Sequence, residues 1–269
     1  MHEDYVHGYS EREWQRLGDQ ASSLAELLHH DTQFYPGETV LEAGCGIGAQ
    51  TIILAQRSPK THFISIDISR ESLSIARSAM AKHDVSNVTF EMADFFDLQF
   101  PDNSFDHVFV CFVLEHMPEP LGVLNSLMRV LRPGGTLTAI EGDHGSTFFS
   151  PDSQAARDAV GCLIEVQAAL GGDSLIGRKL YPILRAAGLQ GVSVTPRCVY
   201  VDNSRPHLEE GFTRRTFAAM VDGVREKVLA MKLLDPLRFD QGVADLKAAT
   251  GPEGTFCYTF FKGSGIKIN

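Results

Sequence analysis

The sequence lacks any long hydrophobic run. No segment of the 269 residues approaches the roughly 18 uninterrupted apolar residues that a membrane-spanning helix needs. The first residues, Met1 to Tyr5, also lack the basic and apolar regions of a signal peptide. Apolar residues make up 43% of the chain, which fits a soluble globular protein. We therefore expect a cytoplasmic protein that has no membrane as a partner.

Positive charge is scarce as well. The chain carries 24 Lys and Arg against 34 Asp and Glu, a formal net charge of -10. Because binding to a phosphate backbone needs a basic face, this charge argues against nucleic acid as the main substrate. No Cys-x-x-Cys pair is present, so we expect reduced, mostly buried thiols and neither a zinc site nor a disulfide framework. The five cysteines are Cys45, Cys111, Cys162, Cys198 and Cys257.

A glycine-rich stretch at residues 40–48, Val-Leu-Glu-Ala-Gly-Cys-Gly-Ile-Gly, is the most informative feature present. An apolar pair leads into it, and residues 49–55 are typical of a helix. The glycines therefore form a loop between a buried strand and a helix N-terminus. Without Cβ atoms, Gly44, Gly46 and Gly48 let the backbone turn sharply and approach a ligand. Such a unit predicts a nucleotide-binding site in an open α/β sheet.

Two kinds of nucleotide fit this loop. Gly44, Gly46 and Ala49 match the dinucleotide fingerprint, and Asp67 stands about 20 residues further on, as that fingerprint expects. Glu42, however, would repel a pyrophosphate at the helix N-terminus, whereas it could attract an ammonium directly or through water. S-adenosylmethionine carries an ammonium and a sulfonium but no phosphate. Its ribose diol and adenine amino group need acceptors, and Asp67 and Asp94 each follow a strand-like run.

Strands and helices alternate from residue 39 to residue 141, which predicts a parallel sheet with helices on both faces. The expected strands lie near 39–43, 62–66, 88–92, 106–111 and 136–141, and the expected helices near 10–30, 49–57, 70–83 and 119–131. Beyond residue 145 we expect helices at 152–170, at 174–187 and through 206–250, with strands near 192–201 and 255–261.

Five motifs in order make the chain similar to the class I S-adenosylmethionine-dependent methyltransferases. The motifs are Glu42-Ala43-Gly44-Cys45-Gly46-Ile47-Gly48, Phe63-Ile64-Ser65-Ile66-Asp67-Ile68-Ser69, Glu91-Met92-Ala93-Asp94-Phe95, the run from Phe105 to His116, and Leu131-Arg132-Pro133-Gly134-Gly135. The chain resembles the small-molecule branch (methyltransferase type 11), which includes the quinone C-methyltransferases, over nearly its whole length. Each motif alone is weak, but their order and ordinary spacing make the resemblance specific.

The resemblance implies a fold and a division into domains. The fold is a Rossmann-like, seven-stranded, mostly parallel α/β sheet with helices on both faces, an antiparallel last strand, an N-terminal helical cap and a helical insertion. We predict the cap at residues 1–35, the cofactor-binding domain at 36–205 and 251–269, and the insertion, a helical lid, at 206–250.

The resemblance also implies which residues hold the cofactor. Asp67 would accept both ribose hydroxyls, unless it only caps the next helix, and Ile68 would pack on the adenine. Asp94 would accept from the adenine amino group, unless it and Phe95 have a purely local role. Backbone carbonyls at the end of the fourth strand would meet the methionine ammonium. The predicted cofactor contacts are Tyr9, Glu42, Gly44, Cys45, Gly46, Asp67, Ile68, Ala93, Asp94, Phe95, Cys111 and Phe112.

In enzymes that the chain resembles, the leading segment folds over the cofactor and the substrate. Tyr5, Tyr9, Trp14, Arg16 and Gln20 are the candidates for that role. The alternative is that Trp14 docks the helix on the core and Arg16 is solvated.

Acids and histidines follow the expected fourth and fifth strands, as Glu115-His116 and Glu141-Gly142-Asp143-His144. At the mouth of a strand, an acid and a histidine could remove a proton from an attacking hydroxyl, amine or carbon acid. We predict His144 as the base. The other catalytic candidates are Asp143, Glu141 and His116, although His116 also fits a packing or hydrogen-bonding role. These side chains could instead bind a metal, but methyl transfer needs none, and we predict no metal.

The sequence as a whole predicts an S-adenosylmethionine-dependent methyltransferase that acts on a small molecule and releases S-adenosylhomocysteine. The acceptor and the methylated atom stay open, as does the oligomeric state, a homodimer included. The alternatives are an NAD(P)-dependent oxidoreductase and a non-enzymatic cofactor-binding regulatory module. We expect residues 1–20, the run 141–144 and the segment 206–250 to close over the methyl group from three sides.

Overall fold

The structure, a computed structural model, describes residues 11–269, with side chains from Trp14 onward. The predicted contacts of Tyr5 and Tyr9 therefore lie outside the described residues. The chain divides into two compact units, and each is described by itself. The sheet unit comprises residues 25–141, 176–196 and 261–269. The helical unit comprises the residues up to 24 together with 142–175 and 197–260.

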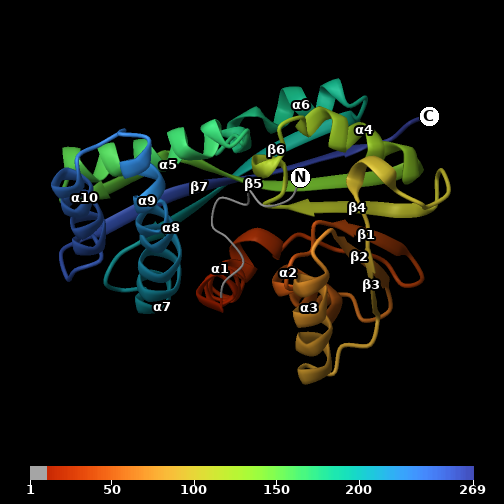
Figure 1. Cartoon of the computed structure of the whole chain (residues 1–269). Helices are drawn as coiled ribbons and strands as arrows, with labels where there is room; N and C mark the ends of the chain where they lie inside the picture. The colour runs from red at the N-terminus through yellow and green to blue at the C-terminus, as the bar shows by residue number, and fades with distance from the viewer. Residues whose placement is uncertain (1–10) are drawn as a thin grey trace. The chain divides into compact units, whose positions relative to one another are not determined.

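The strands of the described chain form a seven-stranded sheet with the order β3-β2-β1-β4-β5-β7-β6 (Figure 1). Their bounds are β1 Thr39–Ala43, β2 His62–Asp67, β3 Val88–Met92, β4 Phe105–Cys111, β5 Leu131–Ser150, β6 Gln190–Val201 and β7 Thr255–Ile266. β1 pairs in parallel with β2 and β4, β2 with β3, and β4 with β5.

The last strand runs against its neighbour. The backbone of Lys267, just past the end of β7, bonds to Gly134 and Gly135 near the start of β5. The amide of Thr259, earlier on β7, instead donates to the hydroxyl of Ser146, later on β5. β7 is therefore antiparallel to β5, and the predicted Rossmann-like sheet with an antiparallel last strand is confirmed.

Helices cover both faces of the parallel strands. In the sheet unit they are α2 Ala49–Arg57, α3 Arg70–Lys82, α4 Pro120–Val130 and α6 Leu180–Ala186, with the 3₁₀ turns η1 Phe95–Asp97, η2 Leu114–His116 and η3 Ile176–Lys179. Figure 1 shows α2 and α3 on one face and α4 and α6 on the other. α1, Glu11–His29, contributes residues to both units.

The core of the sheet unit buries β1 up to the start of the glycine loop. Alternate strand residues face opposite layers. Leu41 and Ala43 of β1 lie in one buried cluster with Leu127 of α4 and Leu180 of α6. β1 is buried from Val40 onward, as expected of a central parallel strand. The glycine loop thus starts from a buried, packed strand end.

β5 is much longer than the predicted strand near 136–141. It runs from Leu131 to Ser150, so the polar run 141–144 lies inside the strand and not at its mouth. Its polar side chains are buried because they find partners within the protein. Gly142 is needed in this run, because a Cβ there would lie 2.3 Å from the hydroxyl oxygen of Tyr258.

The helical unit contains the segment 206–250, which is helical as predicted. Its elements are α7 Pro206–Leu208, the π-helix η4 Glu209–Ala218, α8 Ala219–Gly223, α9 Arg225–Ala230 and α10 Pro236–Ala248. α10 packs on α5, Gln154–Ala169, where a Cβ on Gly242 would lie 2.3 Å from the carbonyl oxygen of Ala155. Within residues 11–269, no helix is both long and apolar enough to cross a membrane. The predicted domain boundaries stay a prediction.

Candidate active site

The glycine loop between β1 and α2 turns through three left-handed glycines. Gly44, Gly46 and Gly48 have φ angles of 78°, 52° and 79°, a region that other L residues rarely adopt. Gly44 is packed in, because a Cβ there would lie 2.5 Å from a methyl carbon of Val113. A Cβ on Gly46 would meet nothing within 4 Å. The loop therefore leaves open space over Gly46, where a ligand can approach the backbone.

Asp67, at the end of β2, bonds to this loop. Its Oδ2 accepts from the amide of Gly46 at 2.8 Å, and its Oδ1 accepts from the amide of Ser69 at 2.8 Å. Ser69 itself caps α3, so Asp67 is not the helix cap. Burial raises the pKa of Asp67, although the backbone donors oppose that rise. Each carboxylate oxygen can accept a further hydrogen bond, such as one from a ribose hydroxyl.

The residues predicted to meet an adenine lie at the ends of β2 and β3. The amide of Ala93 donates to the carbonyl of Asp67 at 3.2 Å, which holds the two strand ends together. Ile68 is 36% exposed, and Phe95 is half-buried. Asp94 is exposed, and its Oδ1 accepts a backbone amide of η1 at 2.9 Å. The local role of Asp94 as a cap is therefore present, and its role toward an adenine stays a prediction.

β4 ends in a turn with an unusual backbone. Phe112 has a φ angle of 57°, and the left-handed region costs a non-glycine residue about 1–3 kcal/mol. Its amide donates to the carbonyl of Ile140 at 2.9 Å. Oε1 of Glu141 accepts from the amides of Val113 and Leu114 at 3.1 and 2.8 Å. These bonds fix the backbone at Phe112. The carbonyls of Phe112 and Cys111 are the ones predicted to meet the cofactor's ammonium.

Two enclosed carboxyl groups lie in this part of the sheet unit. Glu42 is 3% exposed, and its Oε2 accepts from the hydroxyls of Thr51 and Ser65 at 2.7 and 2.6 Å. Burial raises the pKa of Glu42 to about 7. Glu141 has no exposed surface, and its Oε2 is buried without a hydrogen-bond partner. Burial raises the pKa of Glu141 well above its ordinary value. The contact of Glu42 with an ammonium and the catalytic role of Glu141 stay predictions.

The predicted residues Cys111 and His116 lie near the same acids. Nε2 of His116 is 3.6 Å from Oε1 of Glu115 on η2. The charge of Glu115 contributes to the raised pKa of Glu141. Burial, followed by the charge of Glu141, raises the pKa of the Cys111 thiol well above its usual range. The carboxyl groups of Glu115 and Glu141 thus act electrostatically on one another and on the Cys111 thiol, near where β4 meets η2.

The glutamine variant of Glu42 should stabilise the fold above neutral pH. Because the folded-state pKa is raised from 4.5 to about 7, the stabilising contribution of this carboxyl is full below pH 4.5 and is lost as pH rises through about 7. A neutral amide keeps an acceptor for Thr51 and Ser65 and carries no charge to desolvate. We expect a gain of roughly 2–3 kcal/mol in the free energy of unfolding at about pH 8. Urea unfolding of both proteins at about pH 5 and about pH 8 measures it, and an equal difference at both pH values would contradict it.

Asp143 and His144, the other predicted catalytic residues, lie in the helical unit. His144 is 4% exposed, and its Nδ1 lies 2.7 Å from the hydroxyl oxygen of Tyr258. Its ring meets that of Phe217 edge-on, with centroids 5.7 Å apart. Asp143 is 2% exposed and accepts the amide of Gly145 at 3.0 Å. Tyr258, the polar partner of the predicted base, is a residue that the sequence motifs do not reveal.

α1 buries two polar side chains that the sequence singled out. Nη1 of Arg16 donates to Oε1 of Gln20 at 2.9 Å, and both residues are 7% exposed. The alternative of a solvated Arg16 is therefore wrong, because Gln20 gives the guanidinium an acceptor inside the unit. The indole nitrogen of Trp14 is buried without a hydrogen-bond partner. The expected closure of three segments over the methyl group involves both units and stays a prediction.

Metal ligands do not gather in the described part of the chain. Between residues 11 and 269, no three His, Cys, Asp or Glu side chains lie close enough together to hold a metal ion. The acids and histidines predicted to follow the fourth and fifth strands are divided between the two units, since Glu141 belongs to the sheet unit and His144 to the helical unit.

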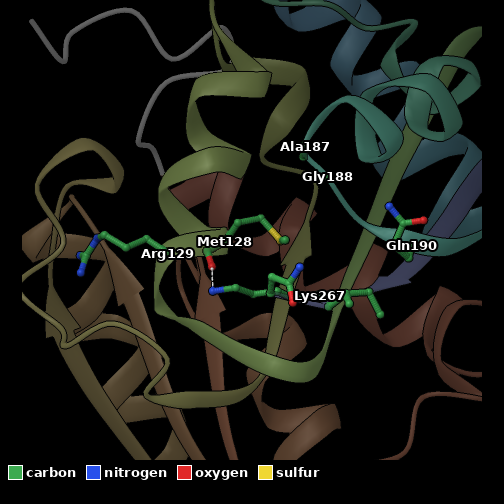
Figure 2. Close-up of a pocket in the computed structure, with 8 residues that line it drawn as sticks. Met128, Arg129, Ala187, Gly188, Gln190 and Lys267 are labelled. Atoms are coloured by element: carbon green, nitrogen blue, oxygen red, sulfur yellow. Dashed lines mark hydrogen bonds between the residues drawn. The ribbon is translucent and has the colours of Figure 1, made fainter.

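A pocket of about 480 Å³ lies elsewhere in the sheet unit (Figure 2). Its lining includes Met128, Arg129, Gln190 and Lys267. Nζ of Lys267 donates to the carbonyls of Met128 and Leu131 at 2.7 and 2.6 Å, so protein acceptors hold this cation. The pocket lies where β5 starts, whereas the glycine loop follows the end of the parallel strand β1. None of the predicted site residues lines it.

Known proteins of similar sequence point to one chemistry. A family model described as a methyltransferase domain matches residues 35–188. A demethylmenaquinone methyltransferase of Listeria monocytogenes is 36% identical over 106 residues, which covers 39% of this chain and 45% of that protein. An arsenite methyltransferase of Halobacterium salinarum is 34% identical over 164 residues, or 60% of this chain and 40% of that protein. The chain thus spans less than half the length of these curated relatives.

A solved structure shares the fold. Phosphoethanolamine N-methyltransferase 2 of Haemonchus contortus, in complex with phosphomonomethylethanolamine and S-adenosylhomocysteine, matches with a TM-score of 0.57 at 16% identity. The match covers 93% of this chain and 53% of that chain. The segment matched by the family model, residues 35–188, contains the glycine loop, Asp67, Asp94 and the run 141–144.

Proposed function

The chain belongs to the methyltransferase domain family, whose cofactor is S-adenosylmethionine, and we propose that it transfers the methyl group of this cofactor to a small-molecule acceptor. The observation that carries the proposal is the open space over Gly46 beside the carboxylate of Asp67. A ribose diol fits there, because Asp67 retains acceptor capacity on both oxygens. The net charge of -10 favours a small acceptor over nucleic acid.

Residues of the sheet unit bind and orient the cofactor in this proposal. Asp67 accepts from the ribose, Gly46 lets the ligand lie against the loop, and the carbonyls of Cys111 and Phe112 accept from the ammonium. When bound, S-adenosylmethionine supplies a methyl group on a sulfonium that is a good leaving group. The protein must align an acceptor atom with the methyl–sulfur bond, and such orientation lowers the barrier by several kcal/mol.

Calorimetric titration with S-adenosylhomocysteine and with NAD tests the cofactor assignment. S-adenosylhomocysteine should bind in a one-to-one ratio, whereas NAD should not compete with it. Binding of NAD alone would support the nicotinamide oxidoreductase instead and overturn the proposal.

Methyl transfer itself is tested with a deuterated methyl donor and mass spectrometry of the products. A metabolite extract serves as the broad acceptor pool. Demethylmenaquinone, arsenite and phosphoethanolamine serve as defined acceptors, since similar proteins are named for them. A labelled small molecule should appear. Tight binding of S-adenosylhomocysteine without transfer to any acceptor would favour a cofactor-binding regulatory module.

His144 is proposed as the base for a protonated acceptor, and its replacement by alanine should lower turnover by about 100-fold or more. The affinity for S-adenosylhomocysteine should change little. The loss of turnover should shrink as pH rises, because a larger fraction of a weakly acidic acceptor has then already lost its proton to the solvent and needs no base. Steady-state rates over a pH series measure both effects.

The phenylalanine variant of Tyr258 is the matched control for the role of His144. It keeps the ring but removes the hydroxyl that lies 2.7 Å from Nδ1 of His144. Its loss of turnover should be smaller than that of the alanine variant, with the same pH trend. Unchanged turnover in the folded alanine variant would exclude His144 as the base. The remaining explanations would be catalysis by proximity alone or Asp143 as the base.

A further inference from the structure

Two cysteines of the helical unit lie in direct contact. Cys198 on β6 and Cys257 on β7 have sulfur atoms 3.1 Å apart, and these strands are neighbours in the sheet. A disulfide bond joins sulfurs at about 2.05 Å, so a shift of about 1 Å would bring these sulfurs to bonding distance. Sequence spacing does not reveal this pair, because 58 residues separate the two positions along the chain.

The two thiols differ in access. Cys198 is exposed, whereas Cys257 is 2% exposed. Burial, together with the neighbouring sulfur, raises the pKa of Cys257 to about 12. An oxidant from solution therefore meets Cys198 first, and Cys257 is placed to attack whatever forms on Cys198.

The other cysteines are poorly suited to oxidation. Cys45 and Cys162 are buried, and Cys111 is half-buried. Burial raises the pKa of Cys45 and Cys111 well above the ordinary value and that of Cys162 to about 11. Cys198 is exposed and lies 3.1 Å from the sulfur of Cys257, so oxidation should begin at Cys198 and involve this neighbour.

The pair also has a special place along the chain. The helical elements α7 to α10, within residues 206–250, lie between Cys198 and Cys257. A bond between the two sulfurs would close this whole segment into one covalent loop. Such a closure restricts the unfolded chain and stabilises the folded state.

We propose that Cys198 and Cys257 form a redox modification site that a small-molecule disulfide converts into a cross-strand disulfide. The thiolate of Cys198 attacks one sulfur of oxidised glutathione and displaces one glutathione thiolate, which takes up a proton. Cys257 then loses its proton and attacks the sulfur of Cys198, displacing the second glutathione. Two protein thiols are oxidised to one disulfide, and one oxidised glutathione is reduced to two thiols.

Incubation of the whole protein with excess oxidised glutathione, without oxygen and with a chelator present, tests the proposal. Intact mass should fall by two hydrogen atoms, and a non-reducing peptide map should show a link between the peptides of Cys198 and Cys257. The thermal midpoint should rise by several degrees and return after reduction with dithiothreitol.

Serine variants distinguish the steps. C257S should stop at a mixed disulfide of glutathione on Cys198, and C198S should form no internal disulfide. C162S, which removes a buried thiol outside the pair, should behave like the parent. If C257S fails to fold, C198S still decides the question, because its side chain is exposed. A parent protein that stays fully reduced, or a link that joins other cysteines or two chains, would overturn the proposal.

Discussion

Alanine in place of Asp67 should weaken the binding of S-adenosylhomocysteine by roughly 100- to 20,000-fold. Two ribose hydroxyls lose their shared acceptor, and each hydrogen bond to a charged group is worth about 1.5–3 kcal/mol. A loss of about 3–6 kcal/mol corresponds to that range. The amide of Gly46 loses its acceptor as well, so the glycine loop also loosens. Calorimetric titration of the parent and the variant measures the change.

Two further variants make this result specific. Glu71→Ala removes an exposed acid from the first turn of α3 and should leave the affinity unchanged. Asp67→Asn keeps one acceptor oxygen and should bind with intermediate affinity. Equal affinity of the folded alanine variant and the parent would show that Asp67 is not the ribose acceptor.

The geometry of the glycine loop and of Asp67 could be predicted because its signals are local. Glu42, the three glycines and the helix that follows them belong to one strand–loop–helix unit. Asp67 ends the next strand, and its contact with Gly46 follows from the parallel pairing of β1 and β2. When the partners of a residue lie within one such unit, the spacing and the types of the residues are enough to predict their contacts.

The length of β5 could not be predicted, because burial of polar residues depends on distant partners. The run 141–144 contains two acids and a histidine, which alone indicate a loop or a strand mouth. In the structure, one carboxylate oxygen of Glu141, Oε1, accepts from amides 27 and 28 residues away, at Leu114 and Val113. His144 bonds with Tyr258, 114 residues away. Only the fold brings these groups together.

The left-handed backbone conformation of Phe112 could not be predicted either. A left-handed residue is indicated in a sequence by glycine or asparagine, and phenylalanine gives no such signal. The turn exists because Glu141 and Ile140 bind the amides around it. The burial of Tyr258, by contrast, is weakly indicated by the sequence. Phe256, Tyr258 and Phe260 alternate along β7 and lie on one buried face, as strand periodicity suggests.

Valine in place of Gly46 should abolish binding of S-adenosylhomocysteine while the fold survives. A Cβ at this position meets no protein atom within 4 Å, so the new side chain enters the open space where the cofactor is proposed to lie. The φ angle of 52° costs a β-branched residue about 1–2 kcal/mol, which is a modest share of the stability of a domain. Calorimetric titration and thermal unfolding of the variant measure the two effects separately.

Gly37→Val is the matched control for this substitution. Gly37 lies in the same unit, has a φ angle of 86°, and a Cβ on it also meets nothing within 4 Å. The two valines therefore impose similar backbone strain, but only the one at position 46 stands over the glycine loop beside Asp67. Thermal midpoints should fall by similar amounts, while only Gly46→Val loses the ligand. Retained affinity in Gly46→Val would show that the loop is a turn and that the cofactor lies elsewhere. Loss of affinity in both variants would show that strain, not occupied space, controls binding.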